Sequence, residues 1–161
     1  MSLSEHEIVS SQELVWIAKT TAIASNVHFC TRFPVAAKID PANWDFFITI
    51  ASVWVALTYL NSANYKISKA EIDEIWNVVN DSLVKEYPDG IRALKDCEAF
   101  MNQTLAADNK IRVDDALGCW IVWNLYGTKD LDEEQSQIIR ILGDMVLTQF
   151  RGFGKSIRPV T

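Results

Sequence analysis

Residues 41–62, PANWDFFITIASVWVALTYLNS, are the most apolar stretch of the chain. Asp40 precedes Pro41, and an acidic residue followed by proline at the first helical position is typical of a helix start. The segment 46–60 carries no charge, but it is shorter than the roughly 20 apolar residues that span a bilayer. The stretch therefore predicts the central helix of a bundle and no membrane span.

Hydrophobic periodicity predicts five further helices, the first of which starts at the capping-box pattern Ser10-x-x-Glu13. Their expected bounds are about 10–27, 68–87, 89–107, 113–126 and 130–150. The fifth helix of the chain contains ALGCWIVWNLY, which is apolar on all sides and should be buried on most of them. No strand pattern of similar strength is present.

The expected fold class is therefore all-α. We predict a single domain over residues 1–161, a bundle of about six helices with the second and fifth at its centre. The two ends, 1–9 and 152–161, are expected to be flexible.

The charge of the chain is unevenly distributed. The formal net charge is −6, which divides into −9 for residues 1–150 and +3 for the tail, where the cations are Arg151, Lys155 and Arg158. An acidic body repels phosphate backbones, so nucleic acid is an unfavourable partner. A protein with a basic surface is the partner that this charge favours.

Two features bear on the compartment. The N-terminal stretch MSLSEHEIVSSQE has neither the basic region nor the apolar region of a secretory signal. Cys30, Cys97 and Cys119 form no C-x-x-C pair and have apolar neighbours, which is typical of reduced cysteines. Both observations predict a cytoplasmic protein.

No catalytic constellation emerges from the sequence. The triplet at 154–156 is Gly-Lys-Ser, but a P-loop also needs a glycine where Gln149 stands. His28, Cys30 and Arg32 are expected in one loop, where they lack the third group that would orient a nucleophile. The residues therefore favour a protein that is not an enzyme.

Metal and cofactor sites are not expected either. The acidic run DLDEE at 130–134 lacks the glycine and terminal glutamate of a calcium loop, and its place at a helix start has a simpler cause in the helix dipole. Asp114 and Asp115 open a helix in the same way. Neither histidine has a second metal-ligating residue at helical spacing.

The interpretation that these observations favour is a non-catalytic protein-interaction module, such as an adaptor, an inhibitor or an immunity-type protein. It would bind its partner through the acidic outer side of the third helix. The partner-binding residues predicted on this basis are Glu71, Glu74 and Asp81, with Trp16 as an apolar anchor.

Two alternatives stay open. In one, the bundle holds a small apolar or aromatic ligand as a sensor or an enzyme, and the predicted ligand-binding residues are Thr49, Ser52, Trp54, Tyr59, Trp120 and Trp123. In the other, the chain is a homo-oligomeric structural protein that uses part of its second or sixth helix as an interface.

Overall fold

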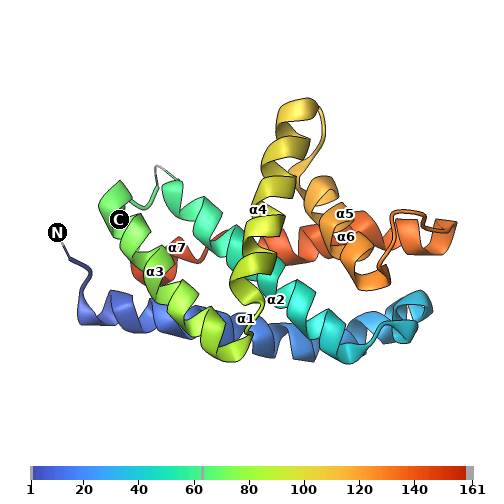
Figure 1. The fold of residues 1–161 in the computed structure, drawn as a ribbon, viewed down its shortest axis with the longest axis horizontal. Helices are drawn as coiled ribbons and strands as arrows, with labels where there is room; N and C mark the ends of the chain where they lie inside the picture. Colours follow the sequence, from blue (N-terminus) through green and yellow to red (C-terminus); the bar gives the residue numbers. More distant parts are fainter. Residues whose placement is uncertain (1, 63, 159–161) are drawn as a thin grey trace.

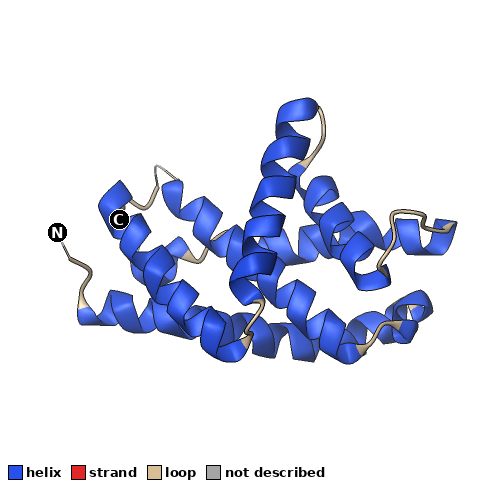
Figure 2. Ribbon diagram, in the orientation of Figure 1, coloured by secondary structure: helices blue, strands red, loops and turns tan. Residues whose placement is uncertain are grey.

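The computed structural model describes residues 2–62 and 64–158, and within these residues every regular element is a helix (Figure 2). The all-α prediction is confirmed. The long helices are α1 (Glu5–Arg32), α2 (Pro41–Thr58), α3 (Lys69–Glu86), α4 (Gly90–Ala107), α5 (Val113–Tyr126) and α6 (Glu133–Phe150). Three short turns of helix complete the fold: η1 (Pro34–Lys38), η2 (Tyr59–Asn61) and α7 (Gly154–Ile157).

Capping chemistry sets several helix ends where the sequence predicts them. The Asp40 carboxylate accepts from the backbone N–H of Ala42 at 2.9 Å, and Gly127 ends α5 in the left-handed conformation with φ of 68°. At α6 the cap is Asp132, which forms a capping box with Gln135, so this helix begins slightly later than predicted.

The first helix is longer than expected at both ends. Ser4 and Glu7 form a capping box, so α1 starts before the predicted box at Ser10, which lies inside the helix. At the other end, buried Phe29 packs against Trp44 with ring centroids 5.2 Å apart. This contact keeps the chain helical past Val27.

The two ends of the chain, predicted to be flexible, are largely built into the fold. Residues 5–9 belong to α1, and at the other end Phe153 and Ile157, which flank and end the last turn α7, are buried. Gly154 lies directly against the ring of Tyr65, where a Cβ atom would be 2.5 Å from the ring carbons. Met1 and residues 159–161 lie outside the described residues.

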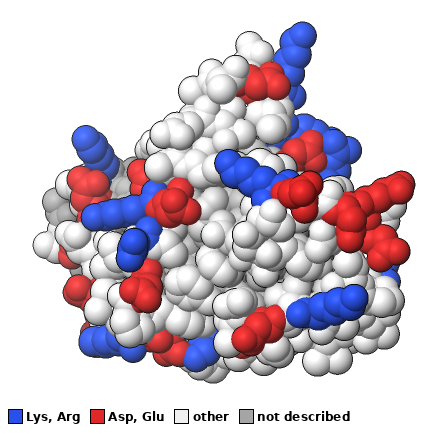
Figure 3. Space-filling model, turned by 45° about the vertical axis from the view of Figure 1, so that its right-hand side comes forward, with Lys and Arg blue, Asp and Glu red and all other residues white. Residues whose placement is uncertain are grey.

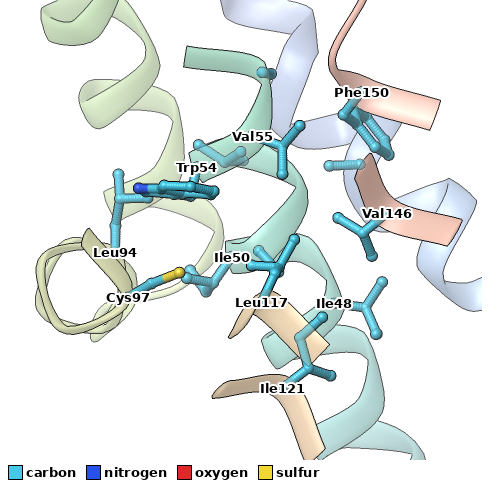
Figure 4. Packing of buried hydrophobic residues seen from close by; sticks show 14 of the residues in the cluster. Ile48, Ile50, Trp54, Val55, Leu94, Cys97, Leu117, Ile121, Val146 and Phe150 are labelled. Atoms are coloured by element: carbon cyan, nitrogen blue, oxygen red, sulfur yellow. The ribbon is translucent and has the colours of Figure 1, made fainter. Parts of the chain in front are cut away.

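Helix α2 occupies the centre of the molecule. Every residue from Ile48 to Leu57 is buried, and α2 packs against α1, α4, α5 and α6. Figure 4 shows Trp54 beside Leu94 of α4, on the opposite side of α2 from Val146 and Phe150 of α6. By length and composition, Pro41–Asn61 could also cross a membrane, but 67% of the residues in its most apolar window are buried inside the fold.

The closest helix crossing is between α5 and α6, which run side by side on the right of Figure 1. A Cβ atom on Gly118 would lie 1.8 Å from the carbonyl oxygen of Ile139, and one on Gly143 would lie 1.8 Å from that of Asp114. Only glycine lets the two backbones touch at this crossing. The contact fixes α5 against α6.

We predict that Gly118→Ala or Gly143→Ala lowers the free energy of unfolding by about 3 kcal/mol or more, because the two helices must separate to admit the new methyl group. Helix propensity alone would stabilise either variant by up to about 1 kcal/mol. Urea unfolding followed by circular dichroism measures the change.

Gly152→Ala is the matched control, since a Cβ atom there meets nothing within 4 Å. Equal stabilities of Gly118→Ala and the wild type would contradict the close backbone crossing.

Candidate functional site

Glu71 does not lie on the exposed acidic face predicted for the third helix. Its side chain is only 5% exposed and is paired with the guanidinium of Arg158, which comes from the C-terminal end of the chain. The same Arg158 Nη2 donates to Glu7 Oε2 of α1 at 2.8 Å, and Arg158 Nη1 donates to the carbonyl of Lys66 at 3.0 Å. We call Glu7, Glu71 and Arg158 the terminal ion cluster.

The terminal ion cluster holds both carboxylates ionised. Hydrogen bonds from Arg158 and from Ser68 lower the pKa of Glu71 to about 2. Burial by itself would raise the pKa of Glu7, but hydrogen bonds from the backbone of Ser4 and from Arg158 outweigh it and lower that pKa. One cation between two buried acids joins α1, α3 and the end of the chain, so its role is structural.

The other two predicted acidic residues have different environments. Glu74 is half-buried and accepts from the backbone N–H of Leu3 at 3.3 Å, whereas Asp81 is exposed. Figure 3 shows Asp and Glu side chains gathered at its right-hand edge and interspersed with Lys and Arg over the rest of that face. Of the three acids predicted on α3, only Asp81 is fully exposed to a partner.

The structure does not bring the six predicted ligand-binding residues together. Thr49, Ser52 and Trp54 are buried in the interior, and the Ser52 hydroxyl donates to the carbonyl of Ile48 at 2.7 Å. Tyr59 is half-buried in η2. The ligand-binding residues predicted within α2 are therefore part of the packed core.

Trp123 of α5 is half-buried and lines a groove between α4 and α5, and Trp120, which is only 3% exposed, lies beneath it. The groove consists of two adjoining cavities of about 650 and 550 Å³, which share Asp96, Trp120 and Asn124. The Trp120 indole N–H donates to Asp96 Oδ2 at 3.0 Å. Sequence reasoning missed Asp96 because nothing in the sequence shows which face of α4 turns toward α5.

A second surface lies on α1, which runs along the lower edge of Figure 1. Trp16 is 67% exposed, in line with Val9 (42%), Ile23 (47%) and Val27 (69%). Val9, Trp16 and Ile23 are seven apart, a spacing that turns only about 20° around a helix, and Val27 follows Ile23 by one turn. These four side chains therefore form one stripe of roughly 27 Å. We call it the outer face of α1.

Sequence reasoning found only Trp16 of this stripe. The heptad spacing of Val9, Trp16 and Ile23 was the available signal, but a second apolar stripe, starting at Leu14, lies on the buried side of the same helix. Because α1 has apolar residues on two sides, its sequence shows no clear polar face, and the pattern does not reveal which of the two stripes is exposed.

The nucleophile candidates are not brought together as a site. His28, Cys30 and Arg32 all lie in the last turns of α1 and not in a loop. Residues two apart on a helix point about 200° away from each other, so His28 and Cys30 face different directions. Within residues 2–62 and 64–158, no three His, Cys, Asp or Glu side chains are grouped to hold a metal ion.

Comparison of the chain with protein-family models, with curated proteins and with solved structures gave no match. The two surfaces described above, the outer face of α1 and the groove between α4 and α5, are the features from which function is inferred.

The terminal ion cluster predicts acid sensitivity. The folded pKa of Glu71, about 2, lies below its ordinary value of 4.5, so its stabilisation is complete above pH 4.5 and is lost as the pH falls toward 2. Arg158→Gln should lower the free energy of unfolding at pH 7 by about 2 kcal/mol and flatten this pH dependence. Urea unfolding between pH 2 and pH 7 measures both effects.

Arg151→Gln removes an exposed cation near the same end of the chain and serves as control. If Arg158→Gln had the same slope of stability against pH as the wild type, the cluster would not be the source of the acid sensitivity.

Proposed function

We propose that this chain is a non-catalytic protein-interaction module that binds a partner protein through the outer face of α1. The observation that supports the proposal is Trp16, a tryptophan exposed in the middle of a helix that is packed on its other side against α2 and α3. Tryptophan is the residue type most enriched at the energetic centres of protein interfaces.

The arrangement of the exposed side chains supports a binding surface over chance exposure. Single apolar residues are common on protein surfaces and need no explanation. Here Val9, Trp16, Ile23 and Val27 share one side of one helix, and Ile17 widens the stripe. An apolar stripe of this kind is what an amphipathic helix or an apolar groove of a partner would cover.

The charges beside the stripe indicate the chemistry of the partner. Glu5 and Glu13 are exposed on the N-terminal half of α1, while the stripe from Trp16 to Val27 carries no charge. The whole chain has a net charge of −6. A partner segment with apolar residues and with Lys or Arg at one end complements both features.

This proposal assigns the acidic contacts with the partner to the start of α1 and not, as the sequence predicts, to the third helix. Glu71 is occupied by Arg158 and is unavailable to a partner, whereas Glu5 and Glu13 are exposed. Trp16 keeps the anchoring role that the sequence predicts for it.

Site-specific photo-crosslinking in cells that produce the protein tests the proposal. A photoreactive phenylalanine derivative placed at position 16 or 23 should capture one protein, identified by mass spectrometry, with a basic and apolar segment at the crosslink. The same group at Val84 of α3 or Ile141 of α6, which are exposed apolar positions elsewhere, should not capture it.

Trp16→Ala should abolish the crosslink from position 23 and change the free energy of unfolding by no more than about 0.5 kcal/mol, because Trp16 is exposed. Equal capture from all four positions would overturn the proposal. A crosslink between two copies of the chain would replace the basic partner with self-association.

A further inference from the structure

The groove between α4 and α5 has the dimensions and lining of a small-molecule site. Its two cavities, about 650 and 550 Å³, each fall within the 300–1,000 Å³ that is usual for ligand pockets. The groove is separate from the outer face of α1, since no residue that lines either cavity belongs to α1. The groove and the partner-binding surface proposed above therefore share no residue.

The floor and walls of the groove are aromatic and are held by contacts with one another. Phe47 of α2 meets Trp120 edge to face at a centroid distance of 5.8 Å, and Phe100 of α4 meets Trp123 in the same way at 5.6 Å. Such pairs restrict the rings, so the groove is formed before a ligand arrives. Aromatic walls of this kind favour a flat or aromatic ligand.

Charges of both signs border the aromatic floor. Asp96 lies where the two cavities join, and the Trp120 indole N–H holds its Oδ2 atom, which leaves Oδ1 for a ligand. Arg92 lies one helical turn earlier on α4, so the two side chains are neighbours on the same face of the helix. Arg92 has no ion-pair partner among the described residues.

We propose that this groove binds a free aromatic α-amino acid. Its ammonium group would be held by Asp96, its carboxylate by Arg92, and its ring by the half-buried Phe47, which packs against the buried Trp120. Arg92 and Asp96 are both exposed, so a ligand with one charge engages only one of them, whereas the amino acid engages both. The planar guanidinium of Arg92 is suited to a carboxylate because it can donate two parallel hydrogen bonds.

Nuclear magnetic resonance of the full chain tests this assignment. L-phenylalanine, phenethylamine and 3-phenylpropionate are titrated separately into the protein, and the indole N–H signals of Trp120 and Trp123 are followed. L-phenylalanine should shift the Trp120 signal and bind at least about tenfold more tightly than either singly charged analogue, because each analogue lacks one charge-assisted interaction.

Asp96→Asn keeps an acceptor for the Trp120 indole but removes the negative charge, and it should weaken L-phenylalanine binding at least about tenfold. Arg92→Gln, an exposed change that does not threaten folding, should do the same. Glu98→Gln lies on the same helix outside the groove and should leave the affinity unchanged.

Three results would overturn the proposal: no shift with any of the three compounds, equal binding of all three, or binding that both groove variants leave intact. Tighter binding of phenethylamine or of 3-phenylpropionate than of L-phenylalanine would show a singly charged ligand and would likewise exclude the amino acid.

Discussion

A helix that is apolar on every side has to be surrounded, and α2 imposes this requirement on the whole molecule. Its residues from Ile48 to Leu57 are all buried, and no single neighbour covers more than one side of it. Helices α1, α4, α5 and α6 each pack against α2, and α3 packs against α1 and α4. The positions of the other helices follow from the need to cover the apolar surface of α2.

The surfaces proposed to bind are consequences of this arrangement. With one side of α1 committed to α2 and α3, its opposite side faces solvent, and the apolar residues there are left exposed. Helix α4 rises away from the other helices in Figure 1 and meets α5 along only part of its length, which leaves the groove that Trp120 and Asp96 line. Both surfaces belong to helices at the edge of the packing around α2.

Two tertiary contacts fix the packed helices relative to one another. Gly118 and Gly143 let the backbones of α5 and α6 touch, and Arg158 draws α1, α3 and the end of the chain together through Glu7 and Glu71. The first contact needs the absence of side chains and the second needs opposite charges. The capping pattern at Ser68 predicts the start of α3, but it does not show that Glu71 also receives Arg158, 87 residues further along the chain.

The sequence by itself determined the all-helical class, the central place of the helix that starts at Pro41 and several helix ends, such as the caps at Asp40 and Gly127. These depend on periodicity and on hydrogen bonds between residues close in the chain. Only the tertiary structure decided that Glu71 is buried, that Thr49 lies in the core while Trp123 borders a groove, and that the outer face of α1 stays exposed. Those outcomes depend on which helix faces meet, and that is set by packing between residues far apart in the sequence.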